Sequence, residues 1–262
     1  MTGKLTALML ILLSLCACST TSPRDGHGRF VPREVVVAGA THRYQVFVPS
    51  QAAGGGHPPV ILFLHGSGER GEDNQSQLNA GLAPYLRKHM DDFPAIVVIP
   101  QAPTDGEWVG DSLKAAVAAL EASTREFGGD TKRTYLTGLS MGGFGTWELA
   151  LMEPNRFAAL VPICGAITQI NPNRPLYVAS VIHEPDPYAA LAAHLRHIPI
   201  WIFHGAKDDV VPPADDRKIY AALKATGADV QYTEFPDANH NSWDATYNHD
   251  AMWKWLFAQH KD

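Results

Sequence analysis

The chain has 262 residues, of which 45% are hydrophobic and 18% are charged, and its formal net charge at pH 7 is −6. This length and composition suit one well-buried globular domain. The negative charge gives no support for nucleic-acid binding, and the sequence shows neither an internal repeat nor a heptad array.

The first residues have the features of a targeting segment. Lys4 provides a single positive charge, and residues 5–15 form an almost wholly apolar run. This run is too short to span a bilayer comfortably and has the length of a signal-peptide core. We therefore expect an exported protein.

The apolar run ends at Leu15-Cys16-Ala17-Cys18, which resembles the end of a bacterial lipoprotein signal. Cys18 is a better candidate for lipidation than Cys16, because the residue before the cleavage point should be small, as Ala17 is and Leu15 is not. Cleavage before Cys18 would leave a protein anchored by acyl chains in the cell envelope, on the periplasmic side of the outer membrane. The alternative is an ordinary signal and a periplasmic or secreted protein. The predicted segments are a signal peptide (1–18), a polar tether (19–33) and a folded domain (34–262).

The first half of the folded domain shows the spacing of apolar residues that is typical of strands in some stretches and of helices in others. Short alternating runs indicate a hairpin of two antiparallel strands, and continuous apolar runs indicate parallel strands buried on both faces. Two stretches with apolar residues at helical spacing complete this half, and Gly128 closes the second. The predicted elements are the hairpin (35–37 and 41–49), two buried strands (60–64 and 95–99) and two helices (78–90 and 112–127).

The next stretch contains Gly138-Leu139-Ser140-Met141-Gly142 between a short apolar run and a segment with helical spacing. Strand, sharp turn and helix are the context of a nucleophile elbow, in which the serine sits on a strained turn. Gly138 and Gly142 leave room for a close approach of the backbone, and the helix directs its free N–H groups toward a developing oxyanion. The pentapeptide alone is a weak signal, so its meaning depends on partners elsewhere in the chain.

The second half continues the alternation of strands and helices. A proline-rich irregular stretch, residues 168–187, is expected to cover the top of the domain as a loop or small cap. The alternation predicts an α/β fold with a mostly parallel, doubly wound sheet covered on both faces, preceded by the antiparallel hairpin. The predicted elements are strands at 157–163, 198–203 and 230–235 and helices at 188–196, 213–226 and 244–259.

Three residue types needed for acyl transfer follow successive late strands. Ser140, Asp208 and His240 occur in the chain order of serine hydrolases with this kind of sheet, and each lies beyond the carboxyl end of a strand. A serine hydroxyl needs a base, an imidazole can take and return its proton, and a carboxylate holds the imidazole in the right tautomer. Asp208 is preferred because it directly follows a glycine turn, and Asp209 is the alternative.

The loop after the strand at 60–64 is expected to supply a second oxyanion donor. The backbone N–H groups of Met141 and Ser67 are the predicted pair, with Gly68 as the alternative to Ser67. His65 is interpreted as a hydrogen-bonding residue of this loop and not as a second base.

Several other side chains admit two interpretations. Glu69, Arg70 and Asp73 either bind substrate or, as we favour, brace the oxyanion loop. Trp108 and Trp243 either line a substrate pocket or pack in the core.

These residues together resemble serine α/β-hydrolases of the dienelactone hydrolase, prolyl oligopeptidase and feruloyl or polyhydroxybutyrate esterase group, including bacterial predicted peptidases and phospholipase/carboxylesterase-like proteins. The resemblance covers about residues 34–260 and implies the α/β-hydrolase fold, a serine mechanism without metal or cofactor, and a small-molecule or polymer-derived ester as substrate. A peptidase, an acyltransferase and a non-catalytic envelope binding protein are the alternatives. Relatives usually have a cysteine where Ala102 stands. The motifs are His65-Gly66-Ser67-Gly68-Glu69-Arg70-Gly71-Glu72-Asp73-Asn74, Pro100-Gln101-Ala102-Pro103 with Trp108, Gly138-Leu139-Ser140-Met141-Gly142-Gly143, His204-Gly205-Ala206-Lys207-Asp208 and His240-Asn241-Ser242-Trp243.

Overall fold

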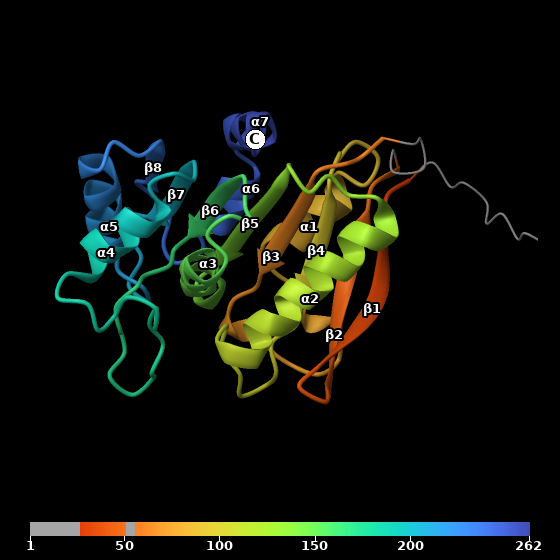
Figure 1. Cartoon of the computed structure of the whole chain (residues 1–262), viewed down its shortest axis with the longest axis horizontal. Helices are drawn as coiled ribbons and strands as arrows, with labels where there is room; N and C mark the ends of the chain where they lie inside the picture. The colour runs from red at the N-terminus through yellow and green to blue at the C-terminus, as the bar shows by residue number, and fades with distance from the viewer. Residues whose placement is uncertain (1–26, 51–55) are drawn as a thin grey trace, which may run out of the picture.

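The computed structural model describes residues 27–50 and 56–262. The predicted signal peptide, Cys18 and the start of the tether lie outside these residues. The described chain forms a sheet of eight strands in the order β1-β2-β4-β3-β5-β6-β7-β8, which runs from right to left in Figure 1. The strands are β1 (Arg29–Val37), β2 (Ala40–Val48), β3 (Val60–Leu64), β4 (Ile96–Pro100), β5 (Thr134–Leu139), β6 (Ala159–Ile163), β7 (Ile200–Gly205) and β8 (Val230–Phe235).

Six strands are parallel, and the other two form the predicted N-terminal hairpin. Strand β1 pairs antiparallel with β2, and β2 joins the rest through an antiparallel ladder with β4. Strands β3 to β8 pair in parallel, so their carboxyl ends lie along one edge of the sheet. The predicted fold class is therefore confirmed.

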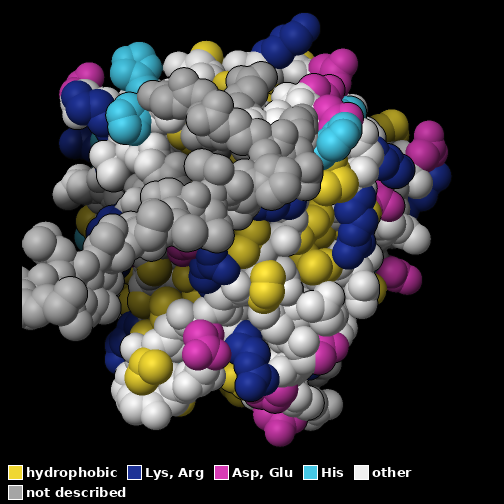
Figure 2. All heavy atoms as spheres, turned by 90° about the vertical axis from the view of Figure 1, so that its right-hand side faces the viewer, with side chains coloured by type: hydrophobic (Ala, Val, Ile, Leu, Met, Phe, Trp, Pro, Cys, Tyr) yellow, Lys and Arg dark blue, Asp and Glu magenta, His cyan; other side chains and the backbone are white. Residues whose placement is uncertain are grey.

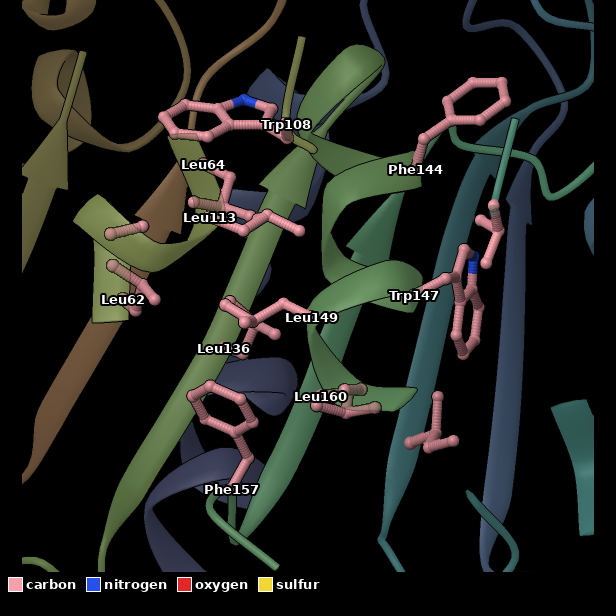
Figure 3. Close-up of a cluster of buried hydrophobic side chains, with 14 of the residues drawn as sticks. Leu62, Leu64, Trp108, Leu113, Leu136, Phe144, Trp147, Leu149, Phe157 and Leu160 are labelled. Atoms are coloured by element: carbon pink, nitrogen blue, oxygen red, sulfur yellow. The ribbon is translucent and has the colours of Figure 1, made fainter. Parts of the chain in front are cut away.

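Helices cover both faces of the sheet, as expected for a sheet whose central parallel strands are buried along their whole length. One face is packed by α2, α3, α4 and α5, and the other by α1, α6 and α7. Figure 3 shows side chains of β3, β5, α2 and α3 interlocking in the first of these layers. The helices are α1 (Leu82–Lys88), α2 (Gly110–Phe127), α3 (Met141–Met152), α4 (Pro187–Leu195), α5 (Ala214–Ala225), α6 (Trp243–Tyr247) and α7 (Asp250–Ala258).

Strand β1 begins at Arg29, inside the segment that was expected to act as a tether. Its residues pair with β2 along their whole length, from Arg29 opposite Val48 to Val37 opposite Ala40. Pro32 is tolerated because β1 is an edge strand, where a missing N–H need not face a partner. Figure 2, which looks onto this side of the molecule, shows hydrophobic side chains interspersed with Lys and Arg side chains.

The predicted C-terminal helix is two helices. Helix α6 ends at Tyr247, and α7 begins after His249, whose backbone is extended and whose ring Nδ1 accepts a hydrogen bond of 3.2 Å from the Met252 N–H. The Asn248 side chain donates to the Asp244 carbonyl oxygen at 2.7 Å and satisfies one of the last carbonyls of α6. Asn248 is a residue type that can end a helix, but neither residue is the glycine or proline that would mark the break strongly.

The stretch between β6 and α4 contains no helix or strand from residue 168 to 186 and projects from the domain as a long loop (Figure 1). It is nevertheless anchored. Leu176, Val178 and Val181 are buried in the layer formed by α2, α3, α4 and α5, and the Ser180 hydroxyl donates to the Glu148 carboxylate at 2.7 Å.

Among the described residues, no helix has both the length and the apolar character needed to cross a bilayer.

Candidate active site

Ser140 occupies the sharp turn between β5 and α3. Its backbone has φ 53° and ψ −119°, a region that residues with a side chain rarely adopt. Strain of this kind costs roughly 1–3 kcal/mol and is retained where the surrounding structure fixes it. The turn therefore has the geometry of a nucleophile elbow.

Two glycines allow this turn to pack against its neighbours. A Cβ on Gly142 would lie 1.9 Å from the Leu64 carbonyl oxygen, and a Cβ on Gly138 would lie 2.2 Å from the Gly142 carbonyl oxygen. Both clashes are with backbone atoms, which cannot move aside as a flexible side chain can. The glycines thus bring the start of α3 against the end of β3, where the loop with Ser67 begins.

The structure brings the three predicted residues Ser140, Asp208 and His240 into one line. His240 Nε2 lies 2.9 Å from Ser140 Oγ, and His240 Nδ1 lies 2.7 Å from Asp208 Oδ2. With the Nδ1 proton directed at the carboxylate, Nε2 is free to accept the proton of the serine hydroxyl. These are the contacts that a serine nucleophile with an oriented base requires.

Asp208 and its neighbour Asp209 have different environments. The side chain of Asp208 is buried, and its Oδ1 accepts hydrogen bonds of 2.9 Å from the N–H groups of Val210 and Val211, whereas Asp209 is exposed. Burial opposes the charge of Asp208, but hydrogen bonds from His204 and His240 outweigh it and hold its pKa well below the usual range. The geometry therefore selects Asp208 over Asp209.

The predicted oxyanion donors lie on both sides of the serine. Met141 is the first residue of α3, and Ser67 opens a short 3₁₀ turn, so no carbonyl within these helical turns can accept their N–H groups. The loop lies close to Ser140: a Cβ built on Gly66 would be 3.6 Å from the Ser140 Cβ. Gly68, the alternative donor, is an exposed residue in the middle of the same turn.

His65 is a buried structural residue of this loop. Its Nδ1–H donates to the Gly66 carbonyl oxygen at 2.6 Å, and its Nε2 accepts from the Ala102 N–H at 3.0 Å. Burial lowers the pKa of His65 to about 4, so the ring is neutral and both nitrogens are occupied. Trp108, only 2% exposed, donates to the His65 carbonyl oxygen at 2.8 Å. The indole supports the loop from within the core and does not line an open surface.

The polar residues after the glycine loop brace it. Arg70 Nε donates to the Ser67 carbonyl oxygen at 3.0 Å. Asp73 accepts from the Gln75 and Ser76 N–H groups and from the Gln101 side chain, at 2.8 to 2.9 Å. These hydrogen bonds, the side-chain contact to Ser76 first, hold the pKa of Asp73 well below its usual range. The contacts favour bracing over substrate binding for Arg70 and Asp73.

Sequence reasoning missed Arg174, which comes from the irregular stretch after β6. Its Nη2 donates to Ser67 Oγ at 2.8 Å, and its Nε and Nη2 bind the Glu107 carboxylate at 2.8 and 2.7 Å. Arg70 lies 3.8 Å from the same carboxylate. A two-bond contact between Arg and a carboxylate is geometrically specific. Because 107 residues separate Arg174 from Ser67 in the chain, no local pattern could have revealed the contact.

Trp243 lies beside the candidate base. Its ring meets the His240 ring edge to face, with centroids 5.6 Å apart, and the residue is half-buried at the start of α6. Trp243 also packs against the layer of α1, α6 and α7, so it joins the candidate base to the core.

Cys164 is the third member of a potential metal-ligand cluster with Asp208 and His240. Within the described chain, the ligand atoms of these residues lie within 4.8 Å of one another. A metal would have to replace the 2.7 Å hydrogen bond between Asp208 and His240. The buried Cys164 would also have to ionise, and burial raises the pKa of its thiol. The residues therefore suit a hydrogen-bonded triad better than a metal site.

Comparison with known proteins finds several relatives that are named as esterases. A bifunctional acetylxylan esterase/xylanase from Neocallimastix patriciarum is 28% identical over 184 residues, which cover 66% of this chain and 22% of the relative. A poly(3-hydroxyoctanoate) depolymerase from Pseudomonas fluorescens is 29% identical over 211 residues, 73% of this chain and 70% of the relative. The matched region spans only 22% and 21% of the first two curated relatives.

Solved structures and a family model agree with the fold. A thermostable esterase superposes with a TM-score of 0.72 at 29% identity, over 88% of this chain and 63% of the other. A ferulic acid esterase shares the fold with a TM-score of 0.66 at 18% identity, over 87% of this chain and 96% of the other. The model of the prolyl oligopeptidase family matches residues 103–262, which include Ser140, Asp208 and His240. This chain is an α/β-hydrolase and belongs to the prolyl oligopeptidase family.

Proposed function

We propose that the protein is a serine hydrolase that cleaves carboxylic esters through an acyl-enzyme. The observation that carries this proposal is the continuous hydrogen-bonded line from Ser140 Oγ through the His240 ring to Asp208 Oδ2. It stands at the edge of the sheet where two backbone N–H groups, those of Met141 and Ser67, are available to an oxyanion.

The mechanism follows from these contacts. His240 Nε2 takes the proton of Ser140 as Oγ attacks the ester carbonyl carbon, and the N–H groups of Met141 and Ser67 stabilise the oxyanion. His240 then protonates the leaving alkoxide, and the carbon–oxygen bond to the alcohol breaks. A water molecule, deprotonated by His240, attacks the acyl carbon. The bond between this carbon and Ser140 Oγ breaks, and His240 returns the proton to Oγ as the acid leaves. Asp208 stabilises the imidazolium in both halves of the reaction.

The preference for esters rests on the relatives. Proteins named as a bifunctional acetylxylan esterase/xylanase, a poly(3-hydroxyoctanoate) depolymerase and a probable carboxylesterase match this chain at 25 to 29% identity. Peptide cleavage is the second candidate, because the family model that matches is that of the prolyl oligopeptidases. Ester and peptide cleavage use the same three residues. The alkoxide of an ester is an easier leaving group than the amine of a peptide, which favours ester cleavage.

The test is a panel of p-nitrophenyl esters and matched peptide p-nitroanilides, assayed with wild type and Ser140→Ala. We expect ester hydrolysis to exceed anilide hydrolysis and to be lost in Ser140→Ala. Anilide hydrolysis above ester hydrolysis would assign a peptidase, and transfer to an added alcohol that outruns hydrolysis would assign an acyltransferase. Ester turnover that persists in Ser140→Ala would contradict the proposed nucleophile.

For location, we propose the lipid anchor at Cys18 that the sequence indicates. The support is the small residue Ala17 before it and the apolar run before that. Metabolic labelling with radioactive palmitate in a bacterial host should label wild type and Cys16→Ser but not Cys18→Ser. Labelling that survives Cys18→Ser would overturn the assignment.

A further inference from the structure

A second imidazole contacts Asp208. His204 lies near the end of β7 and is completely buried. Its Nε2 is 3.2 Å from Asp208 Oδ2, the same oxygen that His240 contacts. Its Nδ1 is 2.7 Å from Asp216 Oδ2, on α5. The triad thus continues inward as a chain of four side chains, from His240 through Asp208 and His204 to Asp216.

The contacts of His204 determine where its protons are. Nε2 also lies 2.8 Å from the Val211 carbonyl oxygen, which can only accept, so Nε2 carries a proton that is directed at Val211, with Asp208 Oδ2 farther away at 3.2 Å. Burial opposes a charge on the ring, but hydrogen bonds to Asp208 and Asp216 outweigh it and raise the pKa of His204 to about 10. His204 is therefore a buried cation flanked by two carboxylates.

The other ionisable groups near this chain have their own partners or lack charge. Asp215, beside Asp216 on α5, accepts from the Ile167 and Thr168 N–H groups and from the Tyr188 hydroxyl. Glu234 on β8, opposite His204 in the sheet, is paired with Arg217 at 2.6 Å. The Cys164 thiol and the Tyr232 hydroxyl have pKa values raised by burial and stay neutral. Burial raises the pKa of Asp216, and His204 partly offsets this.

We propose that His204, held by Asp216, is a positioning residue for the triad. His204 fixes Asp208 Oδ2 toward His240, and its positive charge weakens the attraction of the Asp208 carboxylate for the His240 proton. This inference rests on the proposed serine hydrolysis. The first effect is geometric, because His204 Nε2 lies 3.2 Å from the same Oδ2 that accepts the hydrogen bond of His240 Nδ1, and Oδ1 accepts two N–H groups from the backbone. The second is electrostatic, because a nearby cation reduces the charge that Asp208 presents.

Two substitutions separate the two effects. In His204→Gln the amide nitrogen reaches about as far as Nε2, so an N–H donor stays beside Asp208 Oδ2 and the charge is lost. In His204→Asn the amide reaches only as far as Nδ1, so both are lost. Each variant is also made with Asp216→Asn, which removes the buried carboxylate that would otherwise lose its partner. Ile202→Val, a change to a fully buried residue of the same strand, is the control for altered packing.

The measurement is kcat/KM for a p-nitrophenyl ester as a function of pH, per active site counted with a fluorophosphonate. We expect the acid limb of the profile to move to higher pH by roughly one unit in both His204 variants, because the unscreened carboxylate favours the imidazolium of His240. We expect kcat/KM at the optimum to fall roughly 10- to 100-fold in His204→Asn and to recover in large part in His204→Gln. Ile202→Val should follow the wild-type profile.

The result that overturns the inference is an acid limb that coincides with that of wild type in every soluble His204 variant while only the fraction of active enzyme falls. That outcome would give His204 a purely structural role and leave the proposed hydrolysis intact. A wild-type protein that takes no fluorophosphonate would instead overturn the proposed function, and this inference with it.

Discussion

Asp208 and Asp209 are adjacent in the chain, but of the two the structure places Asp208 against His240. Asp208 is buried, accepts two backbone N–H groups and contacts His240, whereas Asp209 is exposed. The difference arises because the loop after β7 turns the first side chain toward the sheet edge and the second toward solvent.

This contrast gives a matched pair of substitutions. Asp208→Asn keeps the shape of the side chain but can donate to His240 and favour the wrong tautomer, so kcat should fall by roughly 10³- to 10⁴-fold. Asp209→Asn should leave kcat unchanged. Steady-state kinetics on the same ester give the answer, and comparable losses in both variants would refute the assignment of the acid.

The sequence was sufficient to predict which three residues the structure joins by hydrogen bonds, but not which residues hold them in place. Ser140, Asp208 and His240 are found from local signals, each a turn at the end of a strand, together with their order in the chain. Arg174 and the pairing of His204 with Asp216 depend on side-chain directions across separate elements, which spacing does not encode. His204 stands in a sequence motif, but only its contacts with two buried carboxyl groups point to a role.

At the scale of elements, the elbow depends on the contact between the start of α3 and the end of β3. Gly142→Ala would place its Cβ 1.9 Å from the Leu64 carbonyl oxygen, whereas a Cβ on Gly68, in the neighbouring loop, meets no atom within 4 Å. We expect Gly142→Ala to lower the free energy of unfolding by about 3 kcal/mol or more and Gly68→Ala to change it by less than about 0.5 kcal/mol. Urea denaturation measures both, and equal stabilities would disprove the tight contact.

The irregular stretch after β6 is tied to the oxyanion loop by Arg174. Because Arg174 holds Ser67 and is itself held by Glu107, we expect Arg174→Ala to lower kcat about tenfold with little change in KM, less than the loss of a whole oxyanion donor. Arg125→Ala, a change on the remote end of α2, serves as the control.

A double-mutant cycle sharpens this prediction. Arg174→Ala and Glu107→Gln should be non-additive in kcat, with a coupling energy of about 1 kcal/mol or more. Additive effects would show that the two residues act independently and that the contact does not position Ser67.

Element types were predicted well where the pattern was strong, and boundaries less well. Strand β3 and strand β8 have the predicted bounds, and α2 ends at Phe127 with Gly128 as its C-cap, as expected. The start of β1 was placed late because Pro32 and the charged residues around it do not look like a strand, although an edge strand tolerates them. The break between α6 and α7 is made by side-chain hydrogen bonds of Asn248 and His249.

At the scale of the whole molecule, the sheet brings Ser140, Asp208 and His240 together at one edge. It also buries charged side chains, which make the stability of the fold depend on pH. The folded pKa of His204, about 10, lies above its ordinary value of 6.5. Its contribution to stability is therefore fully present below about pH 6.5 and is lost as the pH rises toward 10. Asp208 acts in the opposite direction: its folded pKa is depressed, so its contribution is present above about pH 4 and is lost as the pH falls further.

The alkaline side of this dependence can be tested by difference. We expect the free energy of unfolding of wild type to fall between about pH 6.5 and 10, and to fall less in His204→Gln with Asp216→Asn, which lacks the titrating pair. Denaturant unfolding across this range measures both proteins, and parallel curves would contradict a charged His204.

The central claim is that Ser140 is an activated nucleophile, and the most direct measurement is covalent labelling with a fluorophosphonate followed by peptide mass spectrometry. The predicted result is one adduct on Ser140 in wild type, and no adduct in Ser140→Ala. A wild-type protein that takes no label, an adduct on another residue, or equal labelling of Ser140→Ala would contradict the account.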